Sequence, residues 1–271
     1  MVKNIIGLNI ALLLVISVFG QDKPKTKKEI RRERINQLIK KEEEGSIIFN
    51  TQTVFGARLN SDGYALSFEI AKFKTPSLSN RYELELGEHK SNKEEKFITT
   101  GLSFDVNSFI YGKANNFYYA KLGLGQQRLI GGKGNKNGVA VSLIYGAGFS
   151  AGLLKPYVLE VINNTGNGTE FITYDRFHYD PRFLGNPPNN LPPIVGSPGF
   201  LRGWNKLKFV PGGYAKVALR FDYGRYNKTV TALETGLNIE GYQYGMPIMA
   251  NIKASQIFFN AYIALMFGSR K

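Results

Sequence analysis

The side chains best suited to covalent chemistry in this sequence are its two histidines, each of which has an oxygen-bearing residue close by. His89 precedes Ser91 by two positions, and His178 precedes Asp180 in the same way. Acyl transfer needs a nucleophile, a base and an orienting group within hydrogen-bonding reach of one another. Neither histidine lies in a motif that supplies all three, so we predict that the protein is not an enzyme.

Metal and cofactor sites are not indicated either. The 271-residue sequence has no cysteine, and two histidines without a spaced carboxylate pair do not form a metal-binding pattern. The run Gly131-Gly132-Lys133-Gly134 lacks the strand–loop–helix spacing of a phosphate-binding loop and is interpreted as a turn. We therefore expect no metal and no cofactor.

A larger set of charged residues alternates with apolar residues, which places it on one face of predicted strands. If that face lines a narrow interior, the charges must pair or stay hydrated, because an unpaired buried ion costs several kcal/mol. We predict a salt-bridge network that fills the interior, with a proton or ion path as the alternative. The predicted members are Arg58, Glu69, Glu83, Glu85, Lys121, Arg220, Asp222 and Glu234.

The segments that would position these charges are clearest at the end of the chain. Residues 215–223, 231–239 and 259–267 each place apolar residues at every second position. This period of two predicts β-strands. A soluble sandwich would alternate similarly, with its polar face toward water. Long segments with charges set between Gly and Ala instead favour a closed barrel with lipid outside and a packed interior.

Five earlier segments alternate in the same way, so the sequence predicts an all-β fold, an eight-stranded antiparallel transmembrane barrel over residues 45–271. Connections after strands two, four and six are short, whereas those after strands three, five and seven are long. This is the pattern of outer-membrane barrels, with both chain ends in the periplasm. The expected strands are 47–59, 64–71, 81–86, 117–129, 139–151, 215–223, 231–239 and 259–267.

The N-terminal 44 residues have a different composition. Residues 1–20 are typical of a secretory signal peptide, because their apolar run is shorter than the roughly 20 residues of a membrane-spanning anchor, which is the alternative. Residues 21–44 are highly charged, and Thr26 and Glu29 have the spacing of a helix capping box. We expect a short periplasmic helix or tail there, either solvated and partly disordered or bound to headgroups or to a periplasmic partner.

One long connection, about residues 162–212, is a candidate binding surface. Its length exceeds the roughly 12–15 residues beyond which a structureless loop is unusual. Aromatic residues run through it, and its prolines at 187, 188, 192 and 193 restrict the chain. Exposed aromatics on this scale indicate a self-packed loop, a partner surface or both. The candidate partner-binding residues are Phe177, Tyr179, Phe200, Arg202 and Trp204.

The net charge of +14 is compatible with several partners. No nucleic-acid-binding motif accompanies it, so we expect no nucleic acid as partner. Anionic outer-membrane lipid, including lipopolysaccharide, and protein partners in the outer membrane or at the cell surface account for it equally well.

Several short motifs resemble a largely uncharacterised family of small outer-membrane β-barrel proteins in Bacteroidota. They include Pro211-Gly212-Gly213-Tyr214, Ala232-Leu233-Glu234-Thr235-Gly236 and the terminal Phe267-Gly268-Ser269-Arg270-Lys271. The resemblance extends over most of residues 45–271 and implies the compartment and the barrel, but no reaction. The proline-rich residues 186–198 depart from it.

These observations together favour a non-enzymatic structural or interaction protein of the outer membrane, for instance an accessory subunit of an assembly or secretion complex. Two alternatives stay open. An eight-stranded barrel with an N-terminal helix looks superficially like the outer-membrane lipid A palmitoyltransferase, which suggests an envelope-lipid-modifying, acyltransferase-like enzyme. A narrow pore is the other.

Overall fold

The computed structural model describes residues 26–43, 49–100, 106–133, 138–162, 168–173, 194–224, 228–250 and 252–271. The chain divides into two compact units, residues 1–48 and 49–271. The predicted signal peptide at residues 1–20 lies outside the described residues, as do His178, Phe177 and Tyr179.

The described part of the first unit is one helix, α2 (Lys27–Glu43). It begins at the predicted capping box: the Thr26 amide donates to Glu29 Oε2 at 2.9 Å, and the Glu29 amide donates to Thr26 Oγ1 at 3.3 Å. These two bonds satisfy backbone donors that the first turn leaves unpaired. Within the described residues, no helix has the length and apolar character required to cross a membrane.

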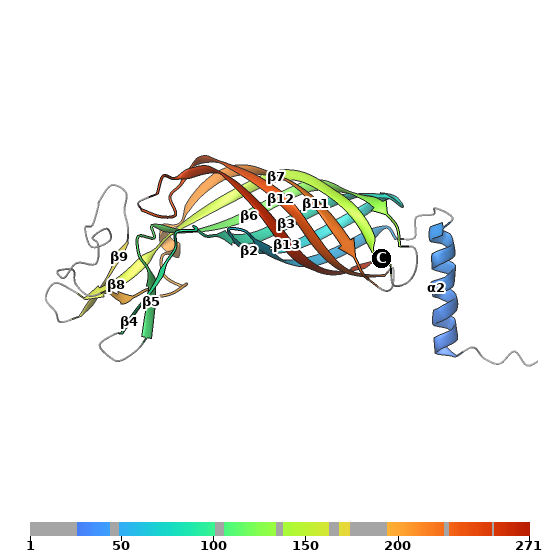
Figure 1. The fold of residues 1–271 in the computed structure, drawn as a ribbon, viewed down its shortest axis with the longest axis horizontal. Coiled ribbons are helices and arrows are strands. Elements are labelled where there is room, and N and C mark those ends of the chain that lie inside the picture. Colours follow the sequence, from blue (N-terminus) through green and yellow to red (C-terminus); the bar gives the residue numbers. More distant parts are fainter. Residues whose placement is uncertain are drawn as a thin grey trace, which may run out of the picture. The chain divides into compact units, whose positions relative to one another are not determined.

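The second unit is an antiparallel barrel that eight strands close completely (Figure 1). Their order around the barrel is β1-β13-β12-β11-β7-β6-β3-β2, so every strand pairs with its neighbours along the chain apart from the inserted short strands. This confirms the predicted all-β, eight-stranded antiparallel fold. The strands are β1 (Thr51–Asn60), β2 (Gly63–Thr75), β3 (Leu78–His89), β6 (Asn115–Gly131), β7 (Ala140–Pro156), β11 (Lys208–Asp222), β12 (Thr229–Met246) and β13 (Ser255–Arg270).

The connections distinguish the two ends of the barrel, which we call the short-turn end and the long-loop end. Residues 76–77, 132–139 and 223–228 join strands at the short-turn end, where the chain also terminates at Lys271. The expectation of a long connection before the last strand is wrong. Because β12 and β13 pair beyond their predicted ends, with Glu240 opposite Phe258, only residues 247–254 remain between them.

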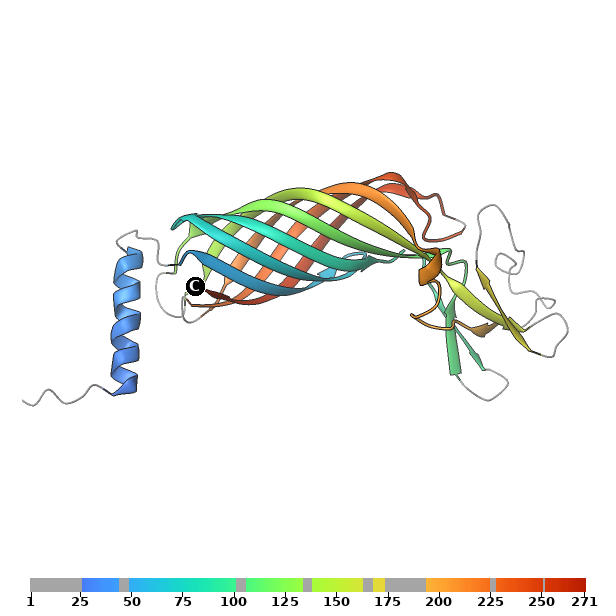
Figure 2. The ribbon, with the colours of Figure 1, turned by 180° about the vertical axis from the view of Figure 1, so that it is seen from behind.

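The long-loop end carries additional structure (Figure 2). A hairpin of β4 (Lys96–Thr100) and β5 (Val106–Ile110) interrupts the β3–β6 connection. A small sheet of β8 (Val158–Ile162), β9 (Thr169–Thr173) and β10 (Ile194–Gly196) follows β7 directly, and the short helix η2 (Trp204–Lys206) precedes β11. Phe109, Tyr157, Leu159 and Val161 form a small hydrophobic core between hairpin and sheet. Ile172 and Ile194 of the predicted loop pack against this core.

The interior of the barrel is filled by two apolar clusters and by buried charged side chains. A cluster that includes Phe117 and Met246 occupies the long-loop end. Another cluster, which includes Val54 and Met266, occupies the short-turn end. The buried charged residues begin between the two clusters and continue among the residues of the second one, where Ala218 lies between Lys216 and Arg220 on β11 and Ala264 pairs with Glu234. An eight-stranded barrel is just wide enough to be filled in this way.

Candidate functional site

Strand register sets the charges of the interior side by side. Arg220 of β11 lies opposite Glu234 of β12, as an oppositely charged pair. Glu69 of β2 lies opposite Glu83 of β3, and two like charges in this arrangement destabilise a sheet. Basic side chains from other strands are therefore needed to compensate the two glutamates.

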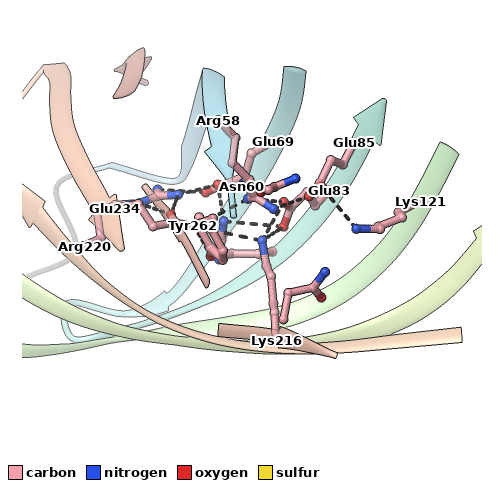
Figure 3. A network of polar contacts seen from close by, with 12 residues as sticks. Arg58, Asn60, Glu69, Glu83, Glu85, Lys121, Lys216, Arg220, Glu234 and Tyr262 are labelled. Atoms are coloured by element: carbon pink, nitrogen blue, oxygen red, sulfur yellow. Dashed lines mark hydrogen bonds and ion pairs between the residues drawn. The ribbon is translucent and has the colours of Figure 1, made fainter. Parts of the chain in front are cut away.

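Arg220 compensates Glu69 from across the barrel (Figure 3). Its Nη1 and Nη2 donate to the two oxygens of Glu69 at 3.1 and 2.6 Å, and its Nε and Nη2 donate to Glu234 Oε2 at 2.9 and 2.5 Å. Arg81 also donates to Glu69, and the Tyr262 hydroxyl donates to Glu234 at 2.7 Å. One guanidinium thereby joins β2, β11 and β12.

Glu83 is held by three basic side chains. Lys216 Nζ donates to Glu83 Oε1 at 2.5 Å, and Arg58 Nη2 donates to the same oxygen at 3.1 Å. Arg81 Nη2 lies 3.7 Å from Glu83 Oε2. Arg58 also donates to Glu85, so this arginine connects Glu83 with the next part of the network.

Lys121 extends the network toward the long-loop end. Its Nζ donates to Glu85 Oε1 at 3.2 Å and to Glu240 Oε1 at 2.6 Å. Glu240 also accepts from the Tyr242 hydroxyl at 2.8 Å and from the side-chain Nδ2 of Asn238 at 2.6 Å. Every carboxylate named so far therefore has more than one donor.

The expectation that the third strand ends at residue 86, which leaves His89 in the long connection after it, is wrong. His89 ends β3 and is buried in the barrel, with Nε2 3.2 Å from Glu240 Oε2. Its Nδ1 lies 2.8 Å from Asp62 Oδ2, which is an ion-pair distance although the angle is not that of a hydrogen bond. The ring stacks on Phe258 with centroids 5.3 Å apart. These contacts give His89 a structural role between two carboxylates.

Asp222 belongs to the interior face but not to the central network. At the short-turn end, its Oδ2 accepts from Arg270 Nη2 at 2.5 Å and its Oδ1 accepts from the Gly224 amide at 2.8 Å. Lys133 Nζ lies 3.5 Å from Oδ1. Asp222 therefore fastens the β11–β12 turn to neighbouring strands. The structure thus places it apart from the other seven residues that were predicted to form the network.

The central network is electrically balanced. In the described interior, five basic side chains contact five glutamates, and none of the ten residues is more than 7% exposed. The set comprises Arg58, Arg81, Lys121, Lys216 and Arg220 with Glu69, Glu83, Glu85, Glu234 and Glu240. These ten side chains are shielded from solvent and balance one another's charge, so the positive excess of the protein lies elsewhere.

The sequence interpretation omitted Arg81, Lys216 and Glu240 from the network. Arg81 and Lys216 share the inward parity of Glu83 and Arg220, so the alternation alone could have included them. Glu240 also shares the parity of Glu234, but it lies beyond the strand end that was predicted at residue 239. Among the described residues, no group of three His, Asp or Glu side chains is arranged to hold a metal ion.

Three of the candidate partner-binding residues are described: Phe200 and Trp204 lie against Tyr118 on the outer wall of the barrel, whereas Arg202 lies against Phe171 of β9. Trp204 stacks on Tyr118 of β6 with ring centroids 5.7 Å apart and an interplanar angle of 14°. Phe200 packs against Trp204 edge to face, with centroids 5.2 Å apart. The guanidinium carbon of Arg202 lies 3.9 Å from the ring centroid of Phe171.

A closed antiparallel barrel with an apolar exterior and a charged, packed interior is the architecture of transmembrane β-barrels. No protein-family model matches the sequence, and no curated protein sequence matches it.

Three solved structures are similar to the chain. Neisserial surface protein A is 7% identical, with a TM-score of 0.38 over 82% of this chain and 96% of that chain. Ail, the attachment invasion locus protein of Yersinia pestis, in complex with the heparin analogue sucrose octasulfate, is 8% identical, with a TM-score of 0.39 over 83% and 100%. The N-terminal β-barrel domain of Pseudomonas aeruginosa OprF is 10% identical, with a TM-score of 0.31 over 81% and 98%. At these identities no function transfers to this chain.

Proposed function

We propose that the protein is a non-enzymatic β-barrel of the bacterial outer membrane that acts as a structural and interaction component of the envelope. Its partners are outer-membrane lipid, including lipopolysaccharide, and other proteins in the outer membrane or at the cell surface. The role of an accessory subunit in an assembly or secretion complex fits this description. The Bacteroidota origin suggested by the sequence motifs stays a prediction, as does the periplasmic position of both chain ends.

The observation that carries the proposal is the apolar exterior. Many large apolar side chains on outward positions of the barrel strands are between 54 and 71% exposed. Apolar patches of this extent are rare on soluble monomers, whereas a lipid bilayer covers them without cost. They include Phe55, Leu59, Leu66, Leu122, Leu124, Phe209, Ile257, Phe259, Ile263, Leu265 and Phe267.

The interior supports a structural role over transport. The charged network is buried and balanced, and apolar clusters pack against it toward both ends of the barrel. A conducting barrel needs a polar, water-filled lumen. The packing therefore disfavours the narrow pore.

The contacts of His89 disfavour the acyltransferase alternative. Nucleophilic catalysis requires a base that reaches its nucleophile. Both ring nitrogens of His89 face carboxylates, those of Asp62 and Glu240, and the ring is covered by aromatic side chains. The other histidine, His178, lies outside the described residues.

Membrane fractionation of cells that express the protein tests the compartment. We expect the protein in the outer-membrane fraction, extractable only with detergent, with faster gel mobility before boiling than after it, because a closed barrel resists dodecyl sulfate. Recovery as a freely soluble periplasmic or cytosolic protein would refute the proposal.

Purification of a tagged copy in mild detergent, followed by mass spectrometry, tests the interaction role. Residues 194–196 pair with β8, so a linker of Gly and Ser should replace residues 186–193 only and leave β10 in place. We expect the shortened protein to form the barrel and to lose co-purifying partners. If the same partners are recovered at the same yield, residues 186–193 are not the interface, and the charged helix α2 becomes the candidate.

A further inference from the structure

A turn before β11 folds back onto the outer wall of the barrel. We call residues 199–206 the aromatic turn, since they include Phe200 and Trp204. Gly199 and Gly203 have φ angles of 83° and 93°, which residues with a Cβ rarely adopt. A Cβ on Gly203 would lie 2.9 Å from the carbonyl oxygen of Pro156, so glycine also permits the close approach of the turn to β7.

A lysine that faces outward from the barrel fastens this turn. Lys155 lies near the end of β7, yet only 2% of its surface is exposed, because the aromatic turn covers it. Its Nζ donates to the Phe200 carbonyl oxygen at 2.5 Å and lies 4.8 and 5.2 Å from the ring centroids of Phe200 and Trp204. The Trp204 indole N–H donates to the same carbonyl at 2.9 Å.

The aromatic turn adjoins the lipid-facing surface. Tyr118, on which Trp204 stacks, pairs with Glu88 of β3 and Leu153 of β7, and Leu153 pairs with Phe209 of β11. These residues form a row across the outer face. On β6, the next outward positions after Tyr118 are Ala120 and Leu122, where the apolar exterior begins. The turn therefore lies at the boundary of that exterior.

The chemistry of the turn fits the same boundary. Leu201 at its tip is 85% exposed, and Phe200 is 59% exposed. Arg202, Lys206 and Lys208 are exposed around them. Aromatic rings with a polar edge settle at the level of lipid headgroups, and basic side chains there attract anionic headgroups.

We propose that the aromatic turn is an interfacial anchor that inserts Phe200, Leu201 and Trp204 among the headgroups and upper acyl chains of the surrounding leaflet, with Lys155 as its positioning residue. The inference rests on the proposed membrane location of the barrel. Continuity with the lipid-facing surface favours lipid over a protein partner for this turn.

Trp204 is the only tryptophan of the chain, so its fluorescence reports on the turn directly. The protein is reconstituted in vesicles of phosphatidylcholine and phosphatidylglycerol that contain phosphatidylcholine brominated either high or low on its acyl chains. We expect stronger quenching by the bromines nearer the headgroup than by the deeper ones, and weak quenching by aqueous iodide. Strong quenching by iodide with none by either brominated lipid overturns the proposal. Protection from both quenchers also overturns it, and indicates a protein contact instead.

Two substitutions separate the anchor from the barrel. Lys155→Met should reduce lipid quenching and increase iodide quenching, whereas Lys253→Met, at an exposed lysine before β13, should change neither. Gel mobility before and after boiling shows whether each variant has folded. An inserted, folded barrel whose Trp204 is not quenched by lipid refutes the anchor alone, whereas a chain that does not insert refutes the membrane location as well as the anchor.

Discussion

At the residue scale, the interior network depends on side chains that reach several partners. Arg220 is 1% exposed and contacts two carboxylates on different strands. A bidentate guanidinium fixes geometry as well as charge, which an ammonium cannot do. The cost of removing such a side chain comes mainly from the buried charges that it leaves behind.

We therefore expect Arg220→Met to lower the free energy of unfolding by about 3–5 kcal/mol, the range found when one partner of a buried pair is removed. Arg220→Lys should lie between this variant and the unmodified protein. The measurement is urea unfolding in detergent micelles, followed by gel mobility. Arg128→Met, at an exposed position of β6, is the control and should change little. Equal midpoints for Arg220→Met and Arg128→Met would contradict the account.

How far sequence predicts the site also depends on individual residues. Alternation identifies the inward positions of Arg220 and Glu234, because parity is a local property of a strand. It does not give the contact of Asp222 with Arg270, since this depends on the register and tilt of strands far apart in the chain. The burial of His89 was missed because the strand was expected to end at residue 86.

At the element scale, the pairing of β6 with β7 tolerates little side-chain volume at certain positions. Gly148 of β7 faces Gly123 of β6, and a Cβ on Gly148 would lie 2.1 Å from the backbone oxygen of Leu122. A backbone atom held in a ladder cannot move aside as a flexible side chain can. Glycine at this position thus allows the two strands to approach.

We expect Gly148→Ala to reduce the yield of folded barrel and to lower its unfolding midpoint. Gly241→Ala is the matched control, because it also lies in a barrel strand but has no atom within 4 Å of the added Cβ. Refolding yield in detergent, read from gel mobility without boiling, measures both variants. The pairing argument fails if Gly148→Ala folds as efficiently as Gly241→Ala.

Element boundaries explain why the connections were predicted less well than the strands. The predicted strand at 231–239 covers only part of β12, which continues to Met246. Its extension contains Gly241, Gln243 and Gly245, so the apolar alternation fades although the backbone pairing persists. Hydrophobic periodicity therefore predicts the lipid-facing part of a strand, but it does not predict the part of the strand that extends beyond the lipid.

At the scale of the whole molecule, the packing of the interior determines whether the barrel conducts. Ions would have to pass the cluster with Phe117 and Met246, and then a region in which the charged network and the cluster with Val54 and Met266 are interspersed. An apolar constriction excludes ions by remaining dry even where a charged layer is loosened. The cluster with Phe117 and Met246 is the barrier of this kind at the long-loop end.

The last prediction concerns that barrier. Planar-bilayer recordings of the pure protein should show no stable single-channel steps, with a porin as positive control in the same bilayers. The double variant Glu83→Ser/Lys216→Ser removes one cation and one anion, so the charge balance is kept while the charged network loses two large side chains. It should unfold at lower urea than Glu94→Ser/Lys113→Ser, which removes an ion pair beyond the end of β3 and outside the central network, and it should still not conduct. Large, stable conductance steps from the unmodified protein would show that the apolar clusters open in a membrane and would favour the pore. Steps from Glu83→Ser/Lys216→Ser alone would mean that the charged network, and not the apolar clusters, closes the barrel.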